Sequence, residues 1–330
     1  MVAAVTTRED GFAEMAYVGA VPWHGLGQEL TVNAPIETWV QQAGMEWKIK
    51  RGVVRYATAR GDDLESIGLM DLPDQHVLFR SDTKKPLGVV SSKYQVVQPS
   101  EVLEFFRGLT EANGYALNTA GTLFDGRKFW ALASIGESAC VVGDDKVEGF
   151  LLLSSSCDGT LATTARFTTV RVVCNNTLGM ALKGAAKHEV IVRHSTAFDA
   201  EEAKKNLGLA RDGFGAFLKA SRQLAAKSVS KTAAADFVEK LLRDTKMITA
   251  QDISKSTPYT RILELFNTSA MGGTLISAEG TAWGMVNAVT EYVDHYAKAS
   301  NDSNRIASAW FGRGDLLKTQ AFEQALALAA

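Results

Sequence analysis

The sequence predicts an α+β fold, in which an antiparallel β meander flanked by helices is followed by an all-helical C-terminal region. Two Asp-Gly pairs separate strand-like runs in the middle of the chain. Strand patterns stop near Ser195, and beyond it apolar residues recur at helical spacing. We therefore expect an α+β core domain at residues 1–195 and a helical domain at residues 196–330.

The N-terminal third is expected to contain two helices and several strands. Pro35 begins a short helix that ends before Gly44, since proline favours the first helical position and glycine the position after the last. β-Branched and aromatic residues predict strands at 47–59, 76–80 and 87–97, with an acidic loop at 61–74. A second helix begins at Pro99 and ends near Asn113.

The predicted meander consists of two hairpins. Runs 115–124 and 127–135 flank Asp125-Gly126, and runs 147–157 and 160–173 flank Asp158-Gly159. An Asp-Gly pair suits a two-residue hairpin turn because both central positions need a positive φ. We expect a helix at 175–183, capped by Asn175 or Asn176, and one more strand at 188–194.

The C-terminal region shows helical spacing of apolar residues at 207–218 and 237–242. Further helices are expected at 258–266, 281–297 and 315–328. Polar segments at 225–231 and 300–304 are expected to join them.

Composition narrows the class of protein. The 35 Lys and Arg residues against 37 Asp and Glu give a net charge of −2, so any site for a polyanion must be local. No signal peptide and no apolar run of roughly 18 residues is present, which predicts a cytoplasmic protein without a membrane partner. The three cysteines are too widely spaced for a metal or redox motif, and the histidines do not cluster. We therefore expect no metal and no cofactor.

A local basic patch is the main candidate site. Residues 161–194 contain five basic residues and one acidic residue, Glu189, and the first hairpin turn adds two more basic residues. Trp130 and Phe167 provide aromatic surface of the kind that single-stranded nucleic acid favours. The candidate nucleic-acid-binding residues are Arg127, Lys128, Arg166, Arg171, Lys183, Lys187, Arg193, Trp130 and Phe167.

The geometry of this patch leaves an alternative open. Arg166 and Arg171 are five residues apart, so they lie on opposite faces of an unbroken strand. A bulge near Thr168 and Thr169 would be needed to align them. Without it, the patch is a solvated sheet face with its aromatic residues in the core.

Two other groups of residues could carry catalytic or metal-binding side chains. His24, between Trp23 and Gly25, is either a catalytic base or part of a loop that packs Trp23. Glu291 and His295 lie four residues apart on a predicted helix, with Asp294 beside them. They are either metal ligands that need a further partner or a solvated polar face.

Several strings resemble the phage/plasmid-like proteins of the family called domain of unknown function 932. They are Trp23-His24-Gly25-Leu26-Gly27, Asp158-Gly159, the run from Thr169 to Leu178 and the runs 280–283 and 287–295. The motif residues include Trp23, His24, Gly25, Gly27, Asp158, Gly159, Arg171, Cys174, Asn175, Asn176, Trp283, Asn287, Asp294 and His295. The resemblance implies no reaction, cofactor or catalytic residue.

The expected order of helix, meander and helix is also similar to that of phage single-strand annealing recombinases of the beta and RecT superfamily. That resemblance implies a homo-oligomer with a basic groove for single-stranded DNA. With the basic patch, it favours a phage- or plasmid-encoded, non-enzymatic protein that binds and anneals single-stranded DNA in recombination.

Two alternatives to DNA annealing remain. One is a metal-dependent hydrolase or nuclease that uses Glu291, Asp294 and His295, with His24 or Asp158 brought near by folding. The other is a structural or oligomerisation protein without catalytic activity.

Overall fold

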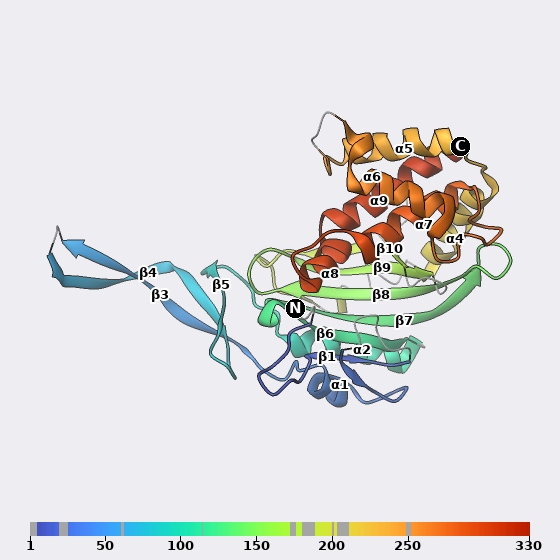
Figure 1. The fold of residues 1–330 in the computed structure, drawn as a ribbon. Coiled ribbons are helices and arrows are strands. Elements are labelled where there is room, and N and C mark those ends of the chain that lie inside the picture. Colours follow the sequence, from blue (N-terminus) through green and yellow to red (C-terminus); the bar gives the residue numbers. More distant parts are fainter. Residues whose placement is uncertain are drawn as a thin grey trace.

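A long sheet, antiparallel except for the pairing of its last two strands, occupies the centre of the molecule, with helices on both of its faces and beyond one edge (Figure 1). The structure is a computed structural model and describes residues 5–19, 26–60, 63–113, 115–171, 176–179, 189–199, 201–202, 211–248 and 252–330. The strand order is β10-β9-β8-β7-β6-β1-β2, and β11 also pairs with β9. The strands of this sheet are β1 (Met15–Tyr17), β2 (Gln28–Glu29), β6 (Ala116–Leu123), β7 (Lys128–Cys140), β8 (Lys146–Ser156), β9 (Thr163–Arg171), β10 (Asn176–Gly179) and β11 (Glu189–Val192).

The described residues after Ser195 contain helices and no strand, as predicted. The α-helices of the described chain are α1 (Ile36–Gln42), α2 (Pro99–Asn113), α4 (Arg211–Ala226), α5 (Lys231–Asp244), α6 (Thr257–Glu264), α7 (Ala282–Glu291), α8 (Asp302–Phe311) and α9 (Arg313–Ala329). π-Helical turns follow α6 at Leu265–Ser269 and α7 at Tyr292–Tyr296. None of the described helices is long and apolar enough to cross a bilayer.

Strands β6 to β9 form the predicted antiparallel meander, and both Asp-Gly pairs lie in its connections, the first within a single 3₁₀ turn at Phe124–Gly126. Asp125 and Gly126 have φ values of 57° and 93°, as the turn chemistry requires, but Phe124 also has a positive φ of 55°. The connection therefore has four residues, 124–127, between Leu123 and Lys128. The second connection is longer still, and Asp158 stabilises it by accepting hydrogen bonds from the backbone N–H and hydroxyl of Thr160.

A β arm projects from the body of the molecule (Figure 1). It consists of β3 (Ile49–Arg60) and β4 (Asp63–Arg80), and β5 (Pro86–Ser91) pairs with β4 only at its base. The prediction of an acidic loop at 61–74 is wrong for residues 63–74, because these residues belong to β4. These residues lie opposite β3, and Arg55 pairs with Asp71 across the hairpin at 2.8 Å.

Two further predictions are wrong. Residues 176–179 form β10 instead of beginning a helix, because the free edge of β9 offers them a hydrogen-bonding ladder. Thr168 and Thr169 strengthen this pairing by donating their hydroxyls to the carbonyl of Leu178. The polar segment at 300–304 contains the start of α8, where Asn301 caps the helix by accepting a hydrogen bond from Asn304 N–H.

Alternating side chains of the sheet contribute to two cores. Ala131 and Leu151 point toward α2 and join a large cluster that extends to Ala325 of α9. Trp130, Leu132 and Phe150 face the other way and pack with Ile306 of α8. The sheet and the C-terminal helices therefore share one large core, and the predicted boundary near residue 195 marks the change from strands to helices.

Candidate nucleic-acid interface

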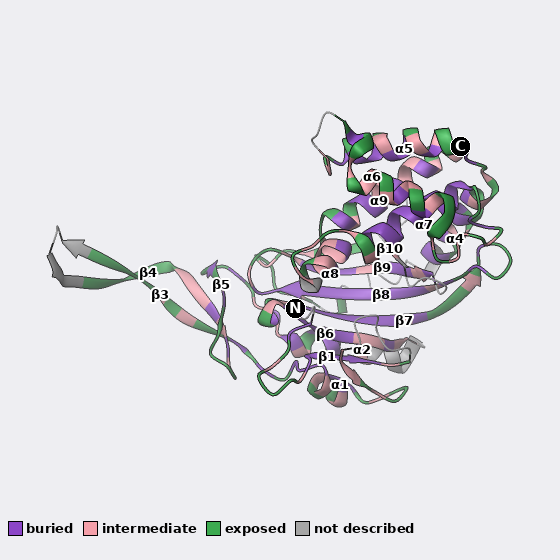
Figure 2. Ribbon diagram, in the orientation of Figure 1, coloured by how far each residue is buried: buried purple, intermediate pink, exposed green. Residues whose placement is uncertain are grey.

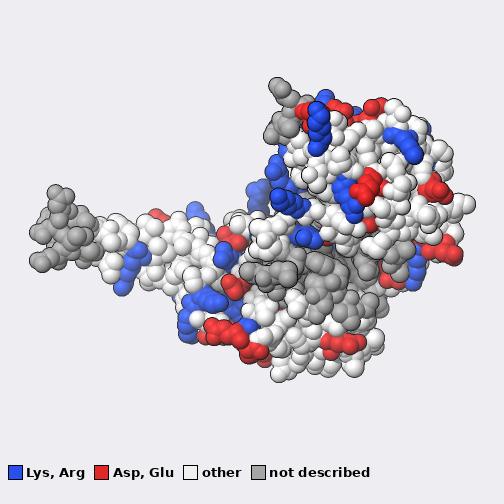
Figure 3. All heavy atoms as spheres, viewed as in Figure 1, with Lys and Arg blue, Asp and Glu red and all other residues white. Residues whose placement is uncertain are grey.

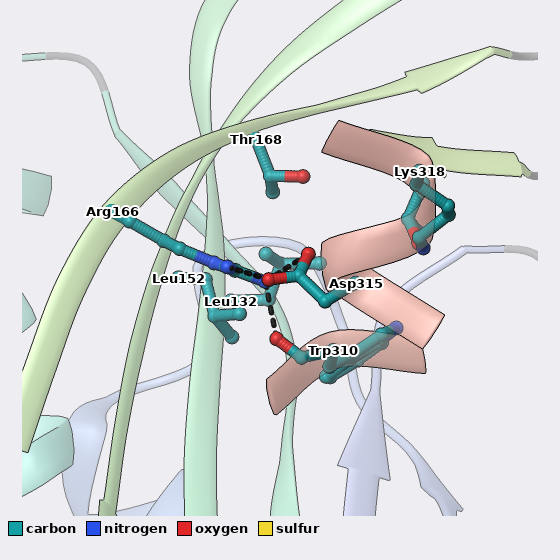
Figure 4. Close-up of a pocket in the computed structure, with 8 residues that line it drawn as sticks. Leu132, Leu152, Arg166, Thr168, Trp310, Asp315 and Lys318 are labelled. Carbon is teal, nitrogen blue, oxygen red and sulfur yellow. Dashed lines mark hydrogen bonds and ion pairs between the residues drawn. The ribbon is translucent and has the colours of Figure 1, made fainter. Parts of the chain in front are cut away.

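Arg166 lies on the sheet face that α8 and α9 cover, and it is bonded within the protein. Its guanidinium contacts both carboxylate oxygens of Asp315, at 2.6 and 3.0 Å, and also donates to the carbonyl of Trp310. Figure 4 shows this pair beside a cavity of about 10 Å³, which has room for a single water molecule. Arg166 therefore attaches β9 to the start of α9, and its guanidinium is not available to bind a phosphate.

Arg171 is also occupied within the protein. It is 3% exposed and contacts both oxygens of Asp145, at 2.6 and 3.0 Å, and it donates to the carbonyls of Met271 and Gly272. Asp145 is fully buried and also accepts hydrogen bonds from Ser277 Oγ and Trp283 Nε1. This cluster joins the loop between β7 and β8 to the segment before α7.

The two arginines remain on opposite faces of β9. Pairing between β8 and β9 runs without a register shift from Val147 opposite Arg171 to Ser154 opposite Thr164. No bulge aligns Arg166 with Arg171, and they bind separate parts of the helical region.

The two candidate aromatic residues belong to the core. Trp130 is 1% exposed and meets Trp310 edge to face, with ring centroids 5.7 Å apart. Phe167 is 2% exposed and points into the large cluster. Neither ring offers a free face on which a base could stack.

The motif carboxylates near the C-terminus also bind groups of the protein. Asp294 accepts hydrogen bonds from the backbone N–H of Thr177 and from Lys318 Nζ, at 2.8 and 2.7 Å. Lys318 is 1% exposed and also donates to the hydroxyl of Thr177. β10 is thereby fixed to α9 and to the π-helical turn after α7.

Glu291 is buried, and its carboxylate accepts a hydrogen bond from the backbone N–H of Met271 at 3.0 Å. Burial raises the pKa of its carboxyl above the ordinary value. Among the described residues, no three His, Cys, Asp or Glu side chains converge in a way that could hold a metal ion. Glu291, Asp294 and His295 thus do not form a ligand set in this arrangement.

The remaining described candidates lie together at one end of the sheet. We call this region the turn-end surface and define it by Lys93, Arg127, Lys128, Gly159, Arg193 and His194. It combines the β6–β7 and β8–β9 turns with the segments that follow β5 and β11. Ser91, Lys93, Gly159, Arg193 and His194 are among the residues that line a groove of about 300 Å³. Figure 3 shows Lys and Arg side chains gathered where the arm joins the body, with acidic side chains beside them.

Charges at the turn-end surface depend on their neighbours. Arg127, Lys93 and Arg193 are exposed, whereas Lys128 is half-buried and contacts the hydroxyl of Thr160. Burial lowers the pKa of Lys128. Burial raises the pKa of Asp158, but hydrogen bonds from Thr160 outweigh it, and the pKa of this carboxyl ends below its usual value.

Tyr94 and His194 hold the groove in shape. Their rings stack with centroids 4.4 Å apart, and the hydroxyl of Tyr94 donates to the carbonyl of Ser156. The two ring nitrogens of His194 lie 3.0 Å from the carbonyls of Gln95 and Leu161. Arg193 is thereby placed beside the β8–β9 turn.

Several predicted residues lie outside the described part of the chain: Trp23, His24, Gly25, Cys174, Asn175, Lys183 and Lys187. Asn176 is described only by its backbone in β10. Gly27 has a φ of 111°, and a Cβ there would lie 3.0 Å from the carbonyl of Met15.

The family described as domain of unknown function (DUF932) matches residues 86–310, more than half of the chain. The chain belongs to the DUF932 family. No curated protein and no solved structure matches it.

The DUF932 match includes the turn-end surface and the Asp145–Arg171 cluster, but it begins after β4 and ends before Asp315 and Lys318. Its motif residues Arg171, Trp283 and Asp294 serve to attach the helices to the sheet. Sequence reasoning missed their partners Asp145 and Lys318, because neither lies near the motifs along the chain. It also missed Lys93 and His194, which carry no local pattern that marks them.

Proposed function

We propose that this DUF932 protein binds single-stranded nucleic acid through the turn-end surface. The observation that carries the proposal is the groove of about 300 Å³ that Lys93 and Arg193 line. Arg127 and Lys128 stand beside it on the neighbouring turn. Cations from separate loops, gathered around one groove, suit a chain of phosphates.

The mode of binding would be to the phosphate backbone. Because Trp130 and Phe167 are buried, these rings do not stack on bases, and the bases stay available for pairing. Such a mode fits a non-enzymatic role in strand annealing during recombination. The same proposal includes a homo-oligomer that acts in the cytoplasm of a cell carrying a phage or plasmid.

The hydrolase alternative has less support. Asp294 is engaged by Lys318 and Thr177, and Glu291 by Met271. A reaction at these residues would first have to break buried contacts.

Charge reversal tests the proposal. The turn-end variant Lys93→Glu/Arg127→Glu/Arg193→Glu should bind single-stranded DNA more weakly than the parent in fluorescence anisotropy. Each lost phosphate contact lowers the slope of log affinity against log salt by roughly 0.7, so three lost contacts should lower it by about two.

The matched control reverses three exposed lysines on the helical part, Lys219, Lys231 and Lys240. It carries the same net charge as the turn-end variant and should keep the parental slope. If the turn-end variant binds as tightly as the parent with an unchanged slope, the proposal fails. Reversal of Arg166 or Arg171 would not be informative, because both residues hold the fold together.

A further inference from the structure

The distal half of the β arm is uncovered. Every described side chain at 55–58 and at 68–74 is exposed, and Figure 2 shows the exposed ribbon extending away from the buried strands of the body. A two-stranded ribbon alone is marginally stable in water. The arm therefore has the properties of a segment that packs against another chain.

Apolar side chains gather on this ribbon. Tyr56 lies opposite Met70, so both rest on the same face, and Leu72 follows two residues after Met70 on its strand. These side chains are 48%, 53% and 39% exposed. Leu69 adds a further 66% exposed side chain on the other face. Large apolar groups on an extended hairpin indicate an interaction surface.

Both edges of the distal arm are also open within the described chain. β3 pairs only with β4, and β5 pairs with β4 only from Gln75 to Phe79. Asp74 accepts a hydrogen bond from the backbone N–H of Ser92, so the outer edge of β4 is free from Asp63 to Pro73. Free edges present unpaired N–H and C=O groups that can accept a strand from another molecule.

The two edges carry opposite charges. The charged side chains that the structure describes are basic on β3, where they are Lys50, Arg51 and Arg55, and acidic on β4 up to residue 74, where they are Asp71 and Asp74. β3 against β3 of another copy would bring like charges together, whereas β3 against β4 brings opposite charges together. The distal arm is close to neutral as a whole, which disfavours a polyanion as its ligand.

We propose that the arm is an assembly surface, on which β3 of one copy pairs edge to edge with β4 of a second copy. Because the two edges differ, the contact is head to tail and generates a ring or a filament instead of a closed pair. Opposite charges fix the order of the strands, and the apolar side chains of adjacent arms come together. The DUF932 match begins at residue 86, so this surface lies outside the matched region, and it does not depend on nucleic-acid binding.

Charge-swap variants test the pairing by sedimentation velocity over a concentration series. The basic-strand variant is Lys50→Glu/Arg55→Glu, and the acidic-strand variant is Asp71→Lys/Asp74→Lys. The parent should self-associate, and each variant alone should dissociate with at least a tenfold rise in dissociation constant. An equimolar mixture of the two variants should recover assembly, since every contact between unlike copies again joins opposite charges.

The matched control, Lys219→Glu/Lys240→Glu, changes the net charge as much as the basic-strand variant and should assemble like the parent. Circular dichroism checks that both arm variants remain folded. A monomeric parent, a variant that assembles like the parent, or a mixture of folded variants that stays dissociated would each overturn the proposal. So would arm variants that assemble normally but lose single-stranded DNA binding, since the arm would then be a nucleic-acid surface.

Discussion

Replacing Asp145 with alanine should destabilise the protein strongly, because its carboxylate binds three buried side chains. Arg171 loses its bidentate partner, and the donors Ser277 Oγ and Trp283 Nε1 lose their acceptor. Breaking a buried ion pair by removing one partner costs roughly 3–5 kcal/mol. We expect Asp145→Ala to lower the free energy of unfolding by about that amount, measured by urea denaturation.

The matched control is Arg55→Ala, which breaks the ion pair between the same residue types on the exposed arm. Both side chains of that pair are more than half exposed, so the loss should be at most about 1 kcal/mol. Asp145→Asn should fall between the two variants, because the amide keeps one acceptor oxygen but loses the charge. The reasoning is refuted if Asp145→Ala unfolds within about 1 kcal/mol of the parent.

Two further predictions concern a buried thiol and a tight turn. Burial, reinforced by the Asp158 carboxylate, raises the pKa of Cys157 to about 12. Maleimide at pH 8 should therefore modify exposed Cys140 far faster than Cys157. The rate at which maleimide modifies Cys157 should still increase above pH 9. Equal modification rates for the two cysteines in peptide mapping would contradict this prediction. Gly126→Ala should cost more than about 2 kcal/mol, since a Cβ would lie 2.5 Å from Trp47 Cζ2 at a positive φ. At Gly159 the φ is also positive, but a Cβ would meet no neighbour, so Gly159→Ala should lower the free energy of unfolding by only about 1 kcal/mol. Equal melting temperatures for the two variants would contradict a clash between the new Cβ at position 126 and Trp47.

Local chemistry made much of the fold predictable. The Asp-Gly turns, the helix that Pro35 precedes and the C-terminal helices depend on residues a few positions apart. The errors occurred where distant contacts decide the structure. The acidic residues at 63–74 look like a loop until β3 is placed beside them, and residues 176–179 become a strand only because β9 has a free edge.

The candidate site was harder to predict for the same reason. Arg166 meets a carboxylate 149 residues away, and Arg171 meets one 26 residues away. A count of charges along the chain therefore includes basic residues that form ion pairs inside the protein and cannot bind an external ligand. The turn position Arg127 could be found from sequence, because a hairpin turn leaves its polar residues at the surface.

The position of α9 has a consequence for how the protein is made. Leu317, Lys318 and Phe322 of this helix are buried, and the helix packs against β10, α4, α5, α7 and α8. Until α9 has emerged from the ribosome, the sheet and the earlier helices lack the lysine that neutralises Asp294 and the ring that stacks on Phe217. Folding of the nascent chain is therefore completed only after α9 leaves the exit tunnel, and until then the apolar surface that α9 covers is open to chaperones.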